Sequence, residues 1–166
     1  MILLSILIKI TSPGPIIHWS KRVGQNNREF LMPKFRTMKI NTPQLATHLL
    51  KDPETYLSSI GRFLRKFSLD ELPQILSVLN GDMTFVGPRP ALFNQDDLVQ
   101  LRNEMGIEKL KPGITGWAQV NGRDEIDISR KVELEREYLT KQGFFFDLYI
   151  IFITFFRVFR KKGVSH

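Results

Sequence analysis

Residues 68–81 read SLDELPQILSVLNG, and this stretch decides how the middle of the chain folds. Ser68 followed three residues later by Glu71 has the spacing of a capping box, which predicts a helix start. The next apolar residues recur at helical spacing: Leu72, Ile75, Leu76 and Leu79. Pro73 has no N–H to donate, so the helix could instead begin near Leu72 with the proline in its first turn. Asn80-Gly81 is typical of a helix end.

Short strands precede this helix and further helices follow it. Residues 42–57 are expected to form loop and helix. Three short strands are predicted, the first two joined through residues 23–27 as a hairpin: Ile16–Trp19, Phe30–Phe35 and Ile114–Val120. Three more helices are predicted: Asp96–Met105, Ile128–Leu139 and about Asp147–Arg160. This mixture predicts an α+β fold, a small mixed domain with a short β-hairpin, several amphipathic helices and a membrane-associated N-terminal helix.

The composition limits the classes of partner. The chain has 166 residues, enough for one domain with a core, and no cysteine, which excludes disulfides and thiolate metal sites. A formal net charge of +7 implies an acidic partner, which could be nucleic acid, an anionic lipid surface or a phosphorylated substrate. Basic residues gather close to the two most apolar segments, an arrangement typical of proteins at an anionic membrane surface.

Two apolar segments are candidates for membrane contact. Neither Met1–Ile10 nor Phe144–Phe159 reaches the roughly 20 apolar residues that a spanning helix needs. The second segment is interrupted by Asp147 and Arg157, which favours a helix lying in the membrane interface. The alternative for both segments is a buried core element.

Two adjacent carboxylates and several basic residues could carry chemistry. Neighbouring helical residues point about 100° apart, so Asp70 and Glu71 suit two tasks, one attacking and the other holding a hard cation such as Mg²⁺. The alternative is that they only stabilise a helix N-terminus. Lys34, Arg65 and Arg89 could bind phosphate, although isolated basic residues are more often solvated surface charges.

Seven motifs follow one another along the chain: Ser12-Pro13-Gly14-Pro15, Arg22-Val23-Gly24, Lys34-Phe35-Arg36-Thr37-Met38, Ser68-Leu69-Asp70-Glu71-Leu72-Pro73-Gln74, Gly81-Asp82-Met83, Val86-Gly87-Pro88-Arg89-Pro90, and Lys111-Pro112-Gly113-Ile114-Thr115-Gly116 continuing through Ala118-Gln119-Val120-Asn121-Gly122-Arg123. In this order they resemble the catalytic domain of bacterial polyprenyl-phosphate hexose-1-phosphate transferases. The match runs from about Ile2 to Val164.

The resemblance implies a reaction and its partners. Members of this family transfer a sugar-1-phosphate, usually from a UDP-sugar, to polyprenyl (undecaprenyl) phosphate and release UMP. They use Mg²⁺ and initiate surface polysaccharide or glycoconjugate synthesis at the cytoplasmic face of the bacterial cell membrane. The aspartate matching Asp70 attacks the sugar-bearing phosphate and forms an aspartyl phosphosugar. The glutamate matching Glu71 is expected to hold Mg²⁺, and the residues matching Lys34, Arg65 and Arg89 are expected to contact the diphosphate or shape the site.

The sequence departs from the family pattern at two places. Glu135 stands where the family usually has an aspartate, three residues before Tyr138, and it is a second candidate metal ligand. Met1–Ile10 resembles only the returning half of the family's N-terminal membrane hairpin. The resemblance therefore predicts a residual membrane-associated segment at residues 1–11 and a catalytic domain at residues 12–166.

Two other functions stay open at this point. An inactive family member without the first half of the hairpin would keep the fold and lack turnover. A basic nucleic-acid-binding module would bind with steep salt dependence, but the sequence holds no recognised nucleic-acid motif, so no nucleic-acid partner is expected.

Overall fold

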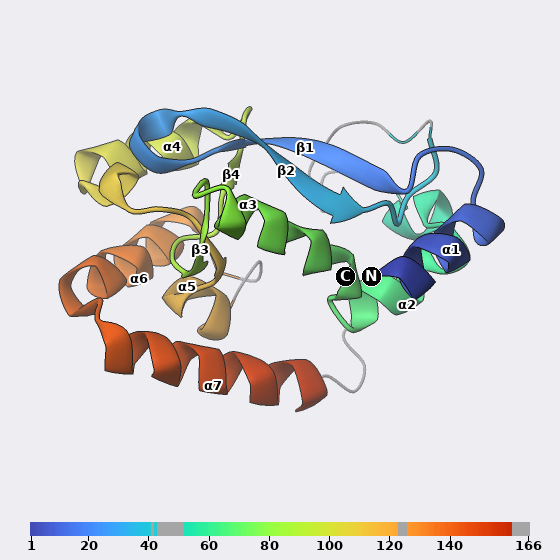
Figure 1. Cartoon of the computed structure of the whole chain (residues 1–166). Helices are drawn as coiled ribbons and strands as arrows, with labels where there is room; N and C mark the ends of the chain where they lie inside the picture. The colour runs from blue at the N-terminus through green and yellow to red at the C-terminus, as the bar shows by residue number, and fades with distance from the viewer. Residues whose placement is uncertain (41, 43–51, 123–125, 161–166) are drawn as a thin grey trace.

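A three-stranded antiparallel sheet forms one side of the molecule. The computed structural model describes residues 1–40, 42, 52–122 and 126–160. The predicted hairpin is confirmed: β1 (Ile17–Val23) pairs with β2 (Glu29–Phe35) in a register that runs from Ile17 opposite Phe35 to Val23 opposite Glu29. The short strand β4 (Ala91–Leu92) pairs with the other edge of β1, which gives the order β2-β1-β4 (Figure 1).

A second, smaller sheet consists of two parallel strands, β3 (Thr84–Val86) and β5 (Gly113–Thr115). The predicted strand at residues 114–120 is wrong beyond Thr115, because the chain turns at Gly116 into the short helix α5 (Trp117–Val120).

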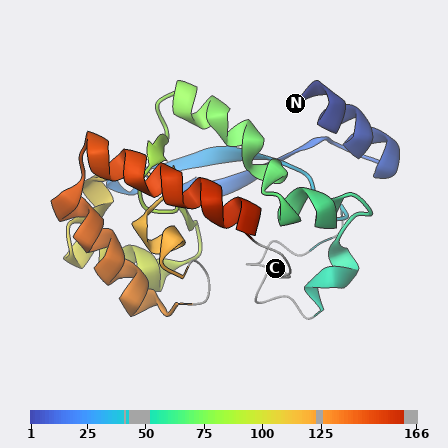
Figure 2. The same cartoon turned by 90° about the horizontal axis from the view of Figure 1, so that it is seen from below.

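Three helices pack against these strands. They are α4 (Asp96–Glu104), α6 (Ile128–Lys141) and α7 (Phe144–Arg160). The Asp127 side chain caps α6 by accepting a hydrogen bond from the Arg130 N–H. Helix α7 starts at Phe144, three residues before the predicted start, and crosses one side of the molecule next to α5 and α6 (Figure 2).

The apolar core is divided into three clusters. One cluster joins β3 to helices α5, α6 and α7. Another joins β4 of the antiparallel sheet to α4, η5 (Ile107–Lys109) and α6. The third joins the hairpin to α1 (Ile2–Thr11) and α2 (Gly61–Lys66) through Ile8, Phe35 and Leu64. Short 3-10 helices connect the larger elements: η1 (Gln25–Asn27), η3 (Pro53–Tyr56) and η5 (Ile107–Lys109). Most of the predicted loop and helix at residues 42–57 lies outside the described residues.

The segment around Ser68 differs from the predicted capped helix. Ser68 adopts the left-handed conformation with φ 53°, and its side chain makes no capping hydrogen bond. The chain then forms the 3-10 helix η4 (Leu69–Gln74), which contains Pro73, before the α-helix α3 (Ile75–Leu79) begins. The predicted capping box is therefore wrong, and Asp70 and Glu71 lie on a 3-10 turn.

Apolar side chains remain exposed on the two terminal helices. Within the described residues no helix is long and apolar enough to cross a membrane. The exposed apolar residues on α1 and α7 include Ile2, Leu3, Ile6, Ile10, Phe144, Phe145, Phe152, Phe155 and Phe156.

Candidate active site

Asp70 is a buried carboxylate at the centre of the candidate site. It lies on η4, which packs against β2 and α2. Burial raises the pKa of Asp70, and the neighbouring Glu71 carboxylate raises it further. Lys34 and Arg65 act in the opposite direction, since a positive charge favours the ionised carboxylate. The group is therefore poorly solvated and surrounded by cations.

Glu71 binds two of the predicted phosphate-binding residues. Its Oε1 accepts a hydrogen bond from Lys34 Nζ at 3.3 Å and from Arg89 Nη2 at 2.9 Å. The pKa of Lys34 is lowered to about 8, mainly by burial, although the Glu71 charge opposes this shift. Arg89 and Arg22 contribute to the lowering, because like charges disfavour the ammonium form. Glu71 thus acts as the counter-ion that holds two cations beside Asp70.

Arg65 approaches the same carboxylates from α2. Its Nε donates to the hydroxyl of Thr37 at 2.9 Å. Burial lowers the pKa of Arg65, and this shift is opposed by Asp70, Glu54 and Glu71. Arg36, from the same motif as Lys34, binds the carbonyl and hydroxyl oxygens of Ser12 instead and so fixes the turn after α1.

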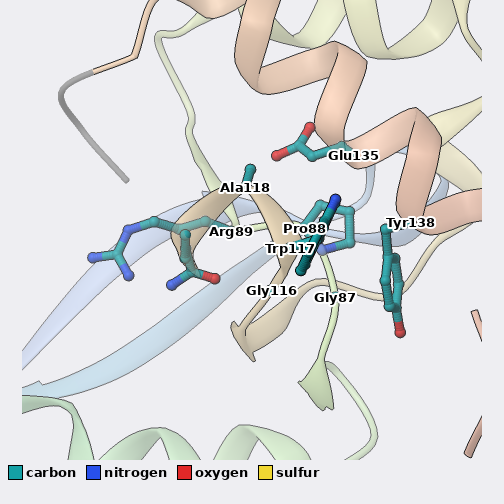
Figure 3. Close-up of a pocket in the computed structure, with 9 residues that line it drawn as sticks. Gly87, Pro88, Arg89, Gly116, Trp117, Ala118, Glu135 and Tyr138 are labelled. Atoms are coloured by element: carbon teal, nitrogen blue, oxygen red, sulfur yellow. The ribbon is translucent and has the colours of Figure 1, made fainter. Parts of the chain in front are cut away.

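The loop that carries Arg89 is held at two backbone carbonyls. Arg22 Nη1 donates to the carbonyl oxygen of Pro90 at 3.2 Å. Arg102 Nη2, from α4, donates to the carbonyl oxygen of Arg89 at 2.9 Å. Pro88 and Pro90 flank Arg89 and fix their own φ angles. The Arg89 guanidinium points away from Glu135 across a small pocket (Figure 3).

The carboxylate of Glu135 binds an arginine and is not part of the Asp70 and Glu71 pair. Its two oxygens accept hydrogen bonds from Arg102, Oε2 from Nε at 2.8 Å and Oε1 from Nη2 at 2.5 Å. The described residues contain no group of three histidine, cysteine or acidic side chains that could hold a metal ion. Glu135 is therefore a poorer candidate than Glu71 for holding a metal ion, because Arg102 already binds both oxygens of the Glu135 carboxylate.

The adjacent carboxylates Asp70 and Glu71 are suited to Mg²⁺. This ion prefers oxygen ligands and usually binds one or two carboxylates together with substrate phosphates. Glu71 already faces the cations that would bind a diphosphate, so an ion held there would lie beside the phosphates. Of the residues with a known place in the structure, Glu71 is the best candidate for holding this ion.

The structure brings together five of the six predicted site residues: Asp70, Glu71, Lys34, Arg65 and Arg89. They interact with one another by hydrogen bonds or through their charges. The sixth, Glu135, binds Arg102 instead. Two residues that organise the site had no role predicted from the sequence: Thr37, which orients Arg65, and Arg102. A signal for Arg102 was present: it lies four residues after the apolar Leu98, on the buried side of the predicted helix.

Comparison with known proteins identifies similar sequences. The sequence model of the family "Bacterial sugar transferase" matches residues 1–161. The UDP-glucose:undecaprenyl-phosphate glucose-1-phosphate transferase of Escherichia coli (strain K12) is 40% identical over 96% of this chain. The uncharacterized sugar transferase EpsL of Bacillus subtilis (strain 168) is also 40% identical over 96% of the chain. A UDP-N-acetylgalactosamine-undecaprenyl-phosphate N-acetylgalactosaminephosphotransferase of Aeromonas hydrophila is 36% identical over 93%.

The chain covers different shares of these relatives. It spans 36% of the Escherichia coli protein, 38% of the Aeromonas hydrophila protein and 77% of EpsL. The relatives' names give different sugars, so similarity alone does not identify a donor.

Proposed function

Because this chain belongs to the bacterial sugar transferase family, we propose that it transfers a sugar-1-phosphate from a UDP-sugar to polyprenyl phosphate. The observation that carries the proposal is the buried Asp70 beside Glu71, with Lys34 and Arg89 on the Glu71 carboxylate and the charge of Arg65 nearby. This cluster combines a nucleophile with cations that match a diphosphate.

Lys34, Arg65 and Arg89 would bind the diphosphate of the donor. Arginine matches phosphate oxygens with two parallel hydrogen bonds, and lysine supplies a compact positive charge. Glu71, Asp70 and Thr37 hold these cations in place through hydrogen bonds and charge. Fixed cations also stabilise the charge that develops on the leaving phosphate.

Asp70 would carry the transfer in two steps. One of its carboxylate oxygens attacks the sugar-bearing phosphorus, the bond from that phosphorus to the UMP oxygen breaks, and UMP leaves with the bonding electrons. A phosphate oxygen of polyprenyl phosphate then attacks the same phosphorus and releases the Asp70 carboxylate. Burial supports this role, since a poorly solvated carboxylate loses less hydration when it attacks.

Glu71 is the residue proposed to hold Mg²⁺. When bound, this ion supplies positive charge to the phosphate oxygens in the transition state. Glu135 is not part of this proposal, because Arg102 binds both of its carboxylate oxygens.

The acceptor places the reaction at a membrane. Polyprenyl phosphate is a lipid, and apolar side chains are exposed on α1 and α7. We therefore propose that the chain works on the membrane surface, at the cytoplasmic face where UDP-sugars are available, and starts a surface glycan.

The proposal is tested by UMP release from a panel of UDP-sugars. The assay uses the chain in nanodiscs with Mg²⁺ and a polyprenyl phosphate. The expected result is release that depends on one sugar and on Mg²⁺, that needs the acceptor beyond the first equivalent of UMP, and that is lost in Asp70→Asn. Release that persists unchanged in Asp70→Asn would overturn the mechanism. No release with any sugar would favour the alternative of an inactive family member.

A further inference from the structure

A buried ion pair outside the proposed chemistry touches the backbone of Arg89. Arg102 on α4 and Glu135 on α6 are 8% and 2% exposed. Taking two charges out of water is costly, so a buried pair is weak evidence for stability in itself. One attested role of such a pair is to fix one arrangement among several. The arrangement that this pair fixes can be identified from the other contacts of Arg102.

Arg102 makes a third hydrogen bond, to the backbone of Arg89. Its Nε and Nη2 bind the two oxygens of Glu135, and Nη2 also donates to the carbonyl oxygen of Arg89 at 2.9 Å. The planar guanidinium allows these three bonds only in one orientation. Glu135 thus sets the orientation of Arg102, and Arg102 sets the position of the Arg89 peptide.

The Arg89 side chain reaches the site from that fixed peptide. Its guanidinium points away from Glu135 (Figure 3). Its Nη2 donates to Glu71 Oε1 at 2.9 Å. Arg22 holds the next carbonyl, that of Pro90, at 3.2 Å. A shift of the Arg89 carbonyl would therefore also move the guanidinium of Arg89, which binds Glu71 next to Asp70.

We infer that Arg102, held by Glu135, is a positioning residue that fixes Arg89 for the phosphate chemistry of Asp70 and Glu71. The inference rests on the proposed function and adds two residues that do not touch the substrate. It gives the buried Glu135 carboxylate a role through Arg102.

A simpler role for the pair is to hold α4 against α6. The apolar cluster of Ala91, Leu98, Ile107 and Val132 already joins these elements. Val132→Ala therefore weakens the same interface without touching the ion pair, and it serves as the matched control. A purely structural role predicts that Arg102→Lys and Val132→Ala behave alike once their stabilities are matched.

The kinetic test is a double-mutant cycle on UMP release. Arg102→Lys keeps the charge and loses the planar fork, so we expect kcat/KM to fall about tenfold. Arg89→Lys is expected to lose at least as much. If Arg102 acts through Arg89, the double variant is no slower than Arg89→Lys alone. Independent, multiplicative losses would overturn the inference, as would an equal loss in Val132→Ala.

A second measurement does not require turnover. The Nε–Hε group of Arg89 is followed by ¹⁵N NMR in nanodiscs, with its signal assigned from Arg89→Lys. Arg102→Lys should shift and broaden this signal, while Val132→Ala should leave it in place. An unchanged Arg89 signal in Arg102→Lys would overturn the inference even where the wild type turns over. A wild type that releases no UMP would defeat the proposed function alone, and the NMR result would still decide the role of Arg102.

Discussion

The fold brings the pKa of Lys34 close to physiological pH. Burial lowers its pKa from 10.5 to about 8, with Glu71 as its ion-pair partner. The ammonium is therefore lost as the pH rises through about 8. Between that pH and 10.5 the unfolded chain binds the extra proton, so this group makes the folded state relatively more stable as the pH rises.

Competitive acetylation of the metal-free protein, read by mass spectrometry, measures this titration. We expect Lys34 to react with a midpoint near pH 8. Glu71→Gln should move the midpoint lower, because the charge that favours the ammonium is removed. A midpoint near 10.5 in the folded protein would contradict the burial of Lys34.

Thr37 holds Arg65 through a single hydroxyl. Thr37→Val keeps the shape and removes the acceptor for Arg65 Nε, so we expect a stability loss of about 1–3 kcal/mol. UMP release should fall about tenfold, since Arg65 loses its orientation. Urea unfolding and the UMP assay measure the two effects.

Thr37→Ser is the control, because it retains the hydroxyl. If Thr37→Ser were as slow as Thr37→Val, the hydroxyl would not be the group that matters at this position.

The site residues could be predicted from the sequence only as an ordered set. Spacing alone left Asp70 and Glu71 open between helix capping and chemistry, and left each basic residue open as a surface charge. The order of the motifs favoured Lys34, Arg65 and Arg89, and the structure brings them together. Arg102 was missed because it lies in none of those motifs and, unlike Arg65, is not close in sequence to Asp70 and Glu71; its partner Glu135 is 33 residues away.

At the level of elements, β3 and β5 depend on a close approach of backbone at Gly113. A Cβ atom on Gly113 would collide with the Gly87 nitrogen and the Thr115 carbonyl oxygen. Gly113→Ala should therefore cost about 1–3 kcal/mol or more through overpacking. It should also slow turnover, because the Gly113 N–H donates to the Pro88 carbonyl at the start of the Arg89 loop.

Urea unfolding of Gly113→Ala and Gly143→Ala measures this effect. At Gly143 the nearest atom to an added Cβ is the Lys141 carbonyl oxygen at 4.0 Å, so that variant should unfold near the wild-type midpoint. Equal midpoints for Gly113→Ala and the wild type would contradict the observed pairing of β3 with β5.

The sequence predicted helix or strand correctly wherever the periodic pattern of apolar residues was long. The hairpin and the helices α4, α6 and α7 were predicted within a few residues. The segments at 68–74 and 114–120 were not, because short apolar runs fit several structures. Ser68 takes a left-handed conformation, which removes it as a cap, and Pro73 is accommodated in a 3-10 helix.

At the scale of the whole molecule, the exposed apolar side chains of α1 and α7 are the features that suit a lipid surface. Phe152 and Phe156 on α7 are 60% and 48% exposed, and their rings contact one another in a tilted arrangement with centroids 4.6 Å apart. Inserting each ring into lipid would contribute about 1.5–3 kcal/mol. Phe152→Ser with Phe156→Ser should therefore weaken vesicle binding by at least about tenfold.

Flotation with vesicles of anionic and zwitterionic lipid measures the binding. Gln100→Ser, on the exposed side of α4, is the neutral control and should bind like the wild type. Equal binding by the doubly substituted chain and the wild type would show that α7 does not contact lipid.

In the proposed mechanism Asp70 carries the phosphosugar between donor and acceptor. Rapid-quench measurement of UMP, with UDP-sugar and Mg²⁺ but without polyprenyl phosphate, detects the first of the two steps alone. We predict a burst of UMP approaching one equivalent per active chain, a matching mass increase on Asp70, and neither in Asp70→Asn. UMP that appears only when polyprenyl phosphate is present, with no mass increase on Asp70, would contradict the claim and indicate direct transfer.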